Sequence, residues 1–191
     1  MIKFIIGIIA IVHITSISYA EDKVSEQNRE ELRFQIVGSV LGAQHSFTPN
    51  PSLEASYFID KNTVISLRLN KYNEDLKDLE EPISYQGQVI QLAYKEFNGN
   101  SFYYRPSIFF REMSIQDTED ADYVFRDLGV GYAIGNQWQW ENFTLGCDWI
   151  GANIRASILY YEDTQSSEVL FRFKGYGLTL DVLNFYLGIS F

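Results

Sequence analysis

The sequence predicts an all-β fold, an eight-stranded antiparallel up-and-down β-barrel. Apolar residues recur at every second position in eight separate runs, and a period of two is the period of a β-strand. The connections between these runs alternate between short and long without exception, which is typical of such barrels. Aromatic residues make up 16% of the chain and proline occurs only four times, a composition that favours strands.

Residues 1–20 have the features of a secretory signal peptide. Lys3 precedes an apolar run over 4–14, and the small residues Ser18 and Ala20 suit cleavage after Ala20. The run is too short to span a bilayer comfortably and no cysteine follows the cleavage point, so we expect export rather than an anchor helix or a lipoprotein. Loss of Lys3 takes the formal net charge from −10 to −11, and so acidic a chain is not expected to bind nucleic acid.

The first half of the remaining chain predicts four strands. Asp60, Lys61 and Asn62 tolerate left-handed backbone conformations and indicate a tight turn between the second and third strands. A charged stretch that contains Pro82 indicates a longer loop. We therefore expect strands over 34–40, 53–59, 63–70 and 88–97, with loops over 44–50 and 71–87.

The second half predicts four more strands. Asn98-Gly99 is the strongest short-range hairpin signal in the chain and leads into the fifth strand, where Pro106 is unusual for a paired residue. A second short turn is expected at Gly135-Asn136-Gln137. The expected strands cover 102–111, 127–134, 143–149 and 183–191, with loops over 112–122 and 152–176.

The last predicted strand has two different faces. Polar or small residues occupy one face, and large apolar residues occupy the other, up to the aromatic residue at position 191. This pattern resembles the C-terminal signature of bacterial outer-membrane β-barrel proteins, where the strand also serves assembly. The signature residues are Leu183, Phe185, Leu187, Ile189 and Phe191.

The resemblance implies a small eight-stranded barrel of the class of OmpX, OmpW and the OmpA barrel domain, in the outer membrane of a Gram-negative bacterium. The charged stretch 21–33 has few apolar residues and no convincing apolar face for a short helix, so we expect a flexible periplasmic segment there and the barrel domain over 34–191. Implied partners are outer-membrane lipid, lipopolysaccharide and, through the C-terminal strand, the barrel-assembly machinery. The extracellular ligand of the loops is left open.

Side-chain size predicts that the apolar face points outward, into lipid. The lumen of an eight-stranded barrel just accommodates side chains, so small residues are expected there. The polar face carries Gly129, Gly131, Ala133, Gly146, Gly188 and Ser190. The apolar residues are too many and too bulky for the lumen, and they include candidates for interfacial aromatic bands: Tyr57, Tyr94, Phe102, Tyr104, Tyr132 and Trp149. The fold class is therefore a transmembrane β-barrel.

On this assignment charged residues of both signs share the lumen. A buried charge must be paired, because isolating one costs many kcal/mol. We expect an internal network of salt bridges and hydrogen bonds that plugs the barrel. Its predicted members are Glu54, Arg68, Lys95, Arg105, Arg111, Asp127 and Asp148.

No catalytic, metal or cofactor site is predicted. His45 and Ser46 suggest a lipid A-modifying acyltransferase or deacylase, but adjacent residues of an extended segment point in opposite directions. The acidic run Asp117, Glu119, Asp120 and Asp122 offers oxygen ligands for Ca²⁺ without the spacing of an EF-hand loop. We expect a structural or surface-interaction protein; the alternatives are the lipid-modifying enzyme, a small-solute pore and a secreted lipocalin-like carrier.

Overall fold

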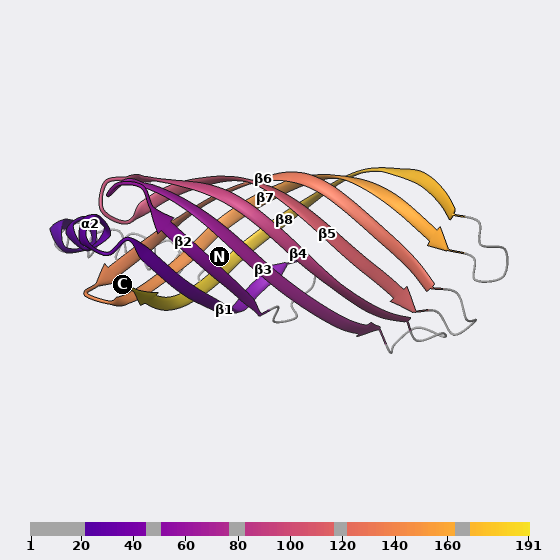
Figure 1. The fold of residues 1–191 in the computed structure, drawn as a ribbon, viewed down its shortest axis with the longest axis horizontal. Helices are drawn as coiled ribbons and strands as arrows, with labels where there is room; N and C mark the ends of the chain where they lie inside the picture. The colour runs from indigo at the N-terminus through magenta and orange to yellow at the C-terminus, as the bar shows by residue number, and fades with distance from the viewer. Residues whose placement is uncertain (1–21, 45–50, 77–82, 117–121, 163–168) are drawn as a thin grey trace, which may run out of the picture.

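The computed structural model describes residues 22–44, 51–76, 83–116, 122–162 and 169–191. Within these ranges the chain forms one helix followed by eight strands (Figure 1). The elements are α2 (Asp22–Glu31), β1 (Phe34–Gln44), β2 (Ser52–Phe58), β3 (Thr63–Leu76), β4 (Ile83–Asn98), β5 (Phe102–Gln116), β6 (Asp122–Trp140), β7 (Phe143–Glu162) and β8 (Val169–Ser190).

The strands form a closed antiparallel barrel in which each strand pairs with its neighbours in sequence. Closure is made by β1 and β8, which pair from Gln35 with Ser190 to Gln44 with Asp181, with register shifts between Ser39 and Ala43. Beyond the end of β8, Phe34 N donates to Phe191 O at 2.9 Å, and Phe191 N donates to Phe34 O at 2.8 Å. The predicted eight-stranded up-and-down barrel, closed by its last strand against its first, is confirmed.

The short turns gather at one end of the barrel (Figure 1). The turn end carries the three short turns, between β2 and β3, β4 and β5, and β6 and β7, and α2 and the C-terminus lie beside them. The strand ends that lead into the four longer connections lie at the opposite end, called the loop end. The tight turn at 60–62 and the Asn98-Gly99 hairpin are confirmed, and Gly99 has the positive φ, 79°, that such a turn requires.

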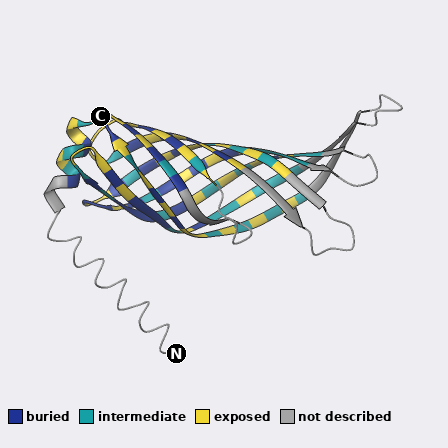
Figure 2. Cartoon of the chain, turned by 90° about the horizontal axis from the view of Figure 1, so that it is seen from below, coloured by how far each residue is buried: buried dark blue, intermediate teal, exposed yellow. Residues whose placement is uncertain are grey.

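Inward and outward side chains alternate along the strands (Figure 2). In β2, Leu53 is 55% exposed whereas its neighbour Glu54 is 1% exposed. The large apolar side chains on the outer surface number 30 among the described residues, while most buried residues are polar or charged. The structure therefore places the apolar face outside and the polar face inside, as expected.

Glycines on the inner face make room for large neighbours. A Cβ atom at Gly146 would collide with the ring of Tyr186, and one at Gly129 would collide with the ring of Phe109. The expectation that small residues relieve a crowded lumen is confirmed at these positions.

The predicted turn at Gly135-Asn136-Gln137 is wrong. β6 continues through this segment to Trp140, and its pairing with β7 shifts register between Ile134 and Gly135. A Cβ atom at Gly135 would collide with the ring of Tyr103. The extra residue of this bulge is Trp149 on β7, and Gly135 is a closely packed strand position opposite it rather than a chain reversal.

The predicted loop over 152–176 is also wrong for most of its length, because β7 extends to Glu162 and β8 begins at Val169. Leu183 has a φ of 53°, and Val182 and Leu183 are both exposed. The outward positions therefore change from even to odd residue numbers at this bulge, so the alternation of the last strand cannot be continued backward from Phe191.

Two more of the predicted loops, over 71–87 and 112–122, are shorter than expected, for a simpler reason. β3 extends to Leu76 and β4 begins at Ile83, within the predicted loop over 71–87. β5 extends to Gln116, and β6 begins at Asp122, within the predicted loop over 112–122. Charged and polar residues continue the paired strands here, and their polarity is what suggested loops.

The segment 21–33 differs from the expected flexible segment, since Asp22–Glu31 forms a helix at the turn end. Ser25 is 2% exposed and Arg29 is 0% exposed. These residues lie one helical turn apart, so they share the face that meets the barrel. A search for an apolar face misses this helix because the residues that dock it are polar. No helix in the described ranges is long and apolar enough to cross a membrane.

Candidate functional site: the polar interior

The lower tier of the lumen is built around Glu54 on β2. Its in-register neighbour on β3 is Arg68, so strand pairing alone places the two side chains next to each other inside the barrel. Arg68 donates to Glu54 Oε2 through Nε at 2.7 Å, and its Nη2 lies 2.6 Å from the same oxygen. Both side chains are almost completely buried.

Asp148 on β7 supplies the second carboxylate of the lower tier. Its Oδ2 accepts from Arg105 Nη2 at 2.9 Å, from Arg68 Nη1 at 3.3 Å and from Asn184 Nδ2 at 2.9 Å. The Tyr103 hydroxyl donates to the other carboxylate oxygen. Because Arg105 Nη1 also lies 3.4 Å from Glu54 Oε2, both arginines bridge carboxylates from β2 and β7 across the lumen.

Lys95 completes the lower tier. Its Nζ donates to Gln137 Oε1 at 2.9 Å and lies 3.5 Å from Glu54 Oε1. The same ammonium group lies 4.8 Å from the ring centroid of Tyr103 and 5.2 Å from that of Tyr186. Side chains from β2 to β8 thus meet within one layer of the barrel.

The upper tier lies nearer the loop end and consists of Arg111, Asp127 and Arg155. Arg111 on β5 and Asp127 on β6 are in register, and Arg111 Nε donates to Asp127 Oδ2 at 2.6 Å. Arg155 Nε lies 3.7 Å from the same oxygen. All seven predicted lumen residues face inward, but they form two tiers rather than one network, and Arg155 is an additional member that the predicted loop over 152–176 concealed.

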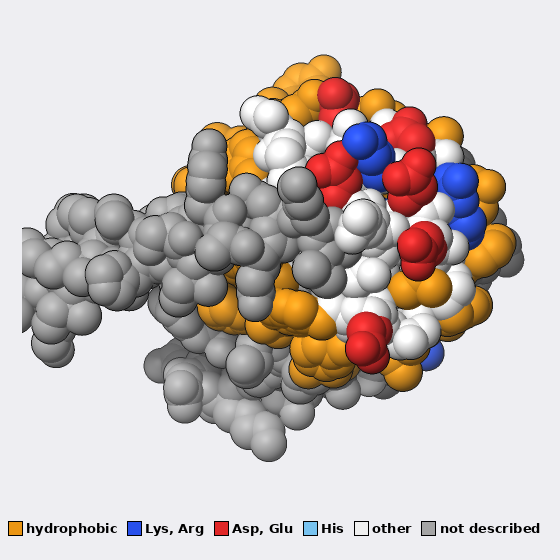
Figure 3. Space-filling view, turned by 90° about the vertical axis from the view of Figure 1, so that its left-hand side faces the viewer, with side chains coloured by type: hydrophobic (Ala, Val, Ile, Leu, Met, Phe, Trp, Pro, Cys, Tyr) orange, Lys and Arg blue, Asp and Glu red, His pale blue; other side chains and the backbone are white. Residues whose placement is uncertain are grey.

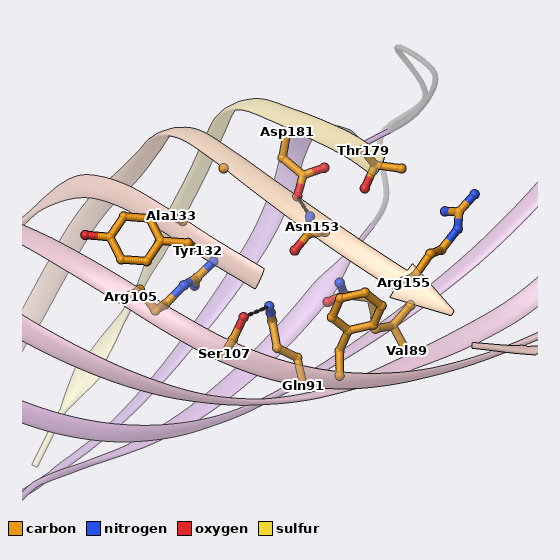
Figure 4. Close-up of a pocket in the computed structure, with 13 residues that line it drawn as sticks. Val89, Gln91, Arg105, Ser107, Tyr132, Ala133, Asn153, Arg155, Thr179 and Asp181 are labelled. Atoms are coloured by element: carbon orange, nitrogen blue, oxygen red, sulfur yellow. Dashed lines mark hydrogen bonds between the residues drawn. The ribbon is translucent and has the colours of Figure 1, made fainter. Parts of the chain in front are cut away.

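A small chamber separates the two tiers (Figure 4). Its free volume is about 60 Å³, and Arg105 lies on one side and Arg155 on another. Two polar pairs line it: Gln91 Nε2 donates to Ser107 Oγ at 2.9 Å, and Asn153 Nδ2 donates to Asp181 Oδ2 at 2.6 Å. Asn153 was missed because it lies in the predicted loop over 152–176, and Asp181 was missed because it precedes the bulge at Leu183.

α2 covers the turn end and is held there by polar contacts. Figure 3 shows charged side chains of both signs at this end, bordered by apolar side chains. Arg29 donates to the carbonyl oxygens of Lys61 at 2.6 Å, Asn100 at 2.5 Å and Gly99 at 3.3 Å, with its guanidinium carbon 4.0 Å from the Phe97 ring centroid. Burial lowers the pKa of Arg29 to about 10, which leaves it charged at neutral pH.

Two further contacts hold α2. Ser25 Oγ donates to Gln139 O at 3.1 Å and accepts from Gln139 N at 3.0 Å. Glu26 Oε1 lies 2.5 Å from Lys61 Nζ, and the hydrogen bond from Lys61 lowers the pKa of Glu26. The partners of α2 therefore lie in or beside all three short turns.

The five signature residues of the C-terminal strand all face outward, with exposed fractions between 42% and 60%. They are Leu183, Phe185, Leu187, Ile189 and Phe191. The assembly role implied for them stays a prediction.

No group of three or more potential metal ligands of the His, Cys, Asp and Glu types occurs among the described residues. His45 and Ser46 of the enzyme alternative lie outside the described residues, as do Asp117, Glu119 and Asp120 of the acidic run. The side chain of Asp122 is not described either.

The closed antiparallel strand order defines the class of the molecule as an up-and-down β-barrel. No protein-family model matches the chain, and no curated protein matches it. Among solved structures, the chain is similar to neisserial surface protein A, with a TM-score of 0.47 and 14% sequence identity. The similarity covers 84% of this chain and 96% of that chain.

Proposed function

We propose that this protein is an outer-membrane β-barrel with a closed lumen and a structural or surface-interaction role carried by the connections at its loop end. One observation carries the proposal: large apolar side chains are exposed on the outer face of every strand. Soluble monomers rarely expose apolar patches larger than a few hundred Å². Burial of a Leu, Ile or Phe side chain is favourable by about 1.5–3 kcal/mol, so a lipid environment stabilises this surface.

Polar residues limit the apolar belt on the side of the loop end. Lys71, Gln88, Glu112 and Arg126 occupy one continuous register across β3 to β6, and they lie outside the lumen. Arg126 Nε donates to Glu112 Oε2 at 2.9 Å, which pairs the two charges at this level. The row fits the boundary between lipid chains and headgroups.

The height of the belt fits a bilayer. On β4, Gln88 and the partly exposed Glu96 enclose the outward residues Ile90, Leu92 and Tyr94. Eight residue steps of a strand tilted by about 40° rise about 20 Å, close to the apolar band of about 25 Å in outer-membrane barrels.

Aromatic residues border the belt at the turn end. The ring of Phe34 lies 5.2 Å from that of Tyr57 and 6.1 Å from that of Phe191. Aromatic rings of this kind collect at the headgroup level of membranes, which supports the turn end as a membrane interface.

The interior supports a closed lumen rather than a pore. The lower tier joins side chains across the barrel, and below it Phe58, Val64, Phe97 and Tyr103 form a fully buried apolar cluster. α2 then covers the turn end. A lipocalin-like carrier would need the reverse arrangement, an apolar lumen and a solvated outer face. The lipid A-modifying alternative depends on His45 and Ser46 and stays a prediction.

Membrane fractionation and conductance test the two parts of the proposal. Full-length protein produced in a Gram-negative host is expected in the outer-membrane fraction as a band whose gel mobility changes on heating; recovery in the soluble periplasm would refute it. In planar bilayers we expect no stable channel of nanosiemens size. Such a channel would refute the closed lumen and leave the membrane location standing.

The C-terminal strand is proposed to engage the barrel-assembly machinery. Phe191→Ala is expected to lower the amount of folded protein in the outer membrane, because it removes the terminal aromatic residue of the signature. Phe110→Ala is the matched control, since Phe110 is also an outward phenylalanine but belongs to β5. Quantitative blotting of unheated membranes measures both variants, and equal amounts of folded protein would contradict the assembly role.

A further inference from the structure

The upper tier faces a cavity that has no role in the proposed function. The cavity has a free volume of about 290 Å³ and lies at the loop-end side of the lumen. Its lining combines charged, apolar and small residues, among them Arg111, Met113, Phe125, Asp127, Arg155 and Ser157. Its size is near the lower end of small-molecule sites.

Arg111 presents an open guanidinium edge to this cavity. Its Nε and Nη2 both contact Asp127 Oδ2, which fixes the plane of the guanidinium. The third nitrogen, Nη1, has no protein partner among the described residues. A guanidinium bound to a carboxylate along one edge can still bind an oxyanion along another.

Arg155 brings a second positive charge to the same carboxylate. Its Nε lies 3.7 Å from Asp127 Oδ2, and 23% of its side chain is exposed. Both in-register neighbours of Arg155 are glycines, Gly129 on β6 and Gly177 on β8. A Cβ atom at Gly177 would lie 2.8 Å from Arg155 Nε, so the arginine side chain lies directly against the Gly177 backbone. The two flanking strands thus carry no side chain beside Arg155.

We infer that the cavity binds a small organic anion, whose carboxylate or phosphate group contacts Arg111 and Arg155 and whose apolar part packs against Met113 and Phe125. Asp127 acts as a positioning residue that holds Arg111 in place. The occupant is a single oxyanion group on a body of about one ring, given the volume of the cavity. The inference goes beyond the proposed function and does not depend on the membrane location.

Matched small molecules test the inference on the wild-type protein. Full-length protein is refolded in maltoside micelles, which contain no phosphate, and titrated calorimetrically with benzoate, phenyl phosphate and benzamide. Benzamide has nearly the shape of benzoate without its charge. At least one anion is expected to bind about tenfold or more tightly than benzamide, as a charged hydrogen bond is lost with the neutral compound. The anion that binds more tightly shows whether the cavity prefers a carboxylate or a phosphate group. Inorganic phosphate, which has no ring, tests whether an apolar part is needed for binding.

Variants then locate the site. Arg111→Gln is expected to weaken anion binding by about tenfold or more, and Arg155→Gln serves as the second variant if the first fails to fold. Arg126→Gln is the control, because Arg126 precedes Asp127 in sequence but lies on the outer face with Glu112. Heat-dependent gel mobility verifies folding.

Three results would overturn the inference: no saturable binding of either anion by the wild-type protein, equal affinity for benzamide, or wild-type affinity in both folded variants. Each of them leaves the location of the barrel in the outer membrane untouched.

Discussion

At Gly146, the missing side chain lets the ring of Tyr186 lie against the β7 backbone. The two residues are in register on β7 and β8, so the contact is a direct cross-strand contact. The Tyr186 hydroxyl lies 3.1 Å from that of Tyr103 and 3.2 Å from Gln137 Oε1. A side chain at position 146 would therefore disturb both the wall and the lower tier.

Gly146→Ala is expected to lower the free energy of unfolding by about 1–3 kcal/mol, the usual effect of overpacking. Gly38→Ala is the control, because the nearest atom to its Cβ would be the carbonyl oxygen of Ser52 at an ordinary 3.8 Å. Urea unfolding in detergent micelles, followed by tryptophan fluorescence, measures the difference. Equal unfolding midpoints for the two variants would contradict the packing argument.

Arg29 is the main docking residue of α2, because its guanidinium donates to three carbonyl oxygens from two turns. Arg29→Ala is expected to weaken helix docking by about 2–4 kcal/mol, from the lost charged hydrogen bonds and the ring contact. Limited proteolysis should then cut within α2 while the barrel stays intact. Gln27→Ala, on the exposed side of the helix, should be cut like the wild-type protein; protection of α2 in the Arg29 variant would contradict the assignment.

At the level of elements, sequence predicted best where strands are regular. β2 and the facing parts of β3, β4 and β5 alternate without interruption, and their turns were placed correctly. The extensions of β7 and β8 were missed because bulges at Trp149 and Leu183 exchange the inward and outward positions. The extension of β6 was missed because Gly135-Asn136-Gln137 resembles a turn. α2 was missed because its partners are backbone groups of distant turns, which a sequence does not show.

The difference between regular strands and strands with bulges also explains which residues of the candidate site could be predicted from the sequence. Lower-tier residues such as Glu54 and Asp148 could be assigned to the lumen by parity, since they lie in regular stretches. Which arginine pairs with which carboxylate could not be predicted, because it depends on how the side chains meet across the barrel. Arg155 and Asp181 lie beyond a bulge, and only a search that restarts the alternation there would have found them.

The attachment of α2 is expected to depend on pH through Glu26. The hydrogen bond from Lys61 lowers the pKa of Glu26, so its stabilising effect is complete above the ordinary carboxyl value of 4.5 and is lost as the pH falls below it. A nitroxide on Gln27→Cys should report greater helix mobility at pH 3.5 than at pH 7. Adding Glu26→Gln should remove most of this change, and an unchanged pH response in that variant would contradict the role of Glu26.

Over the whole molecule, the interior is organised as a series of layers along the barrel axis. From the turn end these are α2, the apolar cluster around Phe97, the lower tier, the chamber and the upper tier. The lower tier joins side chains from β2 to β8 by hydrogen bonds and ion pairs, whereas the upper tier faces the cavity of about 290 Å³. Stability is therefore expected to depend mainly on the lower tier, and ligand binding on the upper tier.

Neutralising one member of the lower tier tests this division. Asp148→Asn leaves Arg68 and Arg105 with one carboxylate between them, and breaking such a buried group typically costs about 3–5 kcal/mol. We expect a clearly lower temperature for heat-induced unfolding in detergent, read from gel mobility. The double variant Arg105→Gln with Asp148→Asn should lose less than the sum of the two single variants, because the pair is coupled.

The outward pair Glu112 and Arg126 supplies the control for this experiment. Their side chains are 35% and 47% exposed, and an exposed ion pair contributes about 0–1 kcal/mol. Glu112→Gln should therefore unfold near the wild-type temperature although it also removes one charge of a salt bridge. If Asp148→Asn unfolded at the same temperature as Glu112→Gln, the lower tier would not stabilise the barrel, and closure of the lumen would have to rest on the apolar cluster and α2 alone.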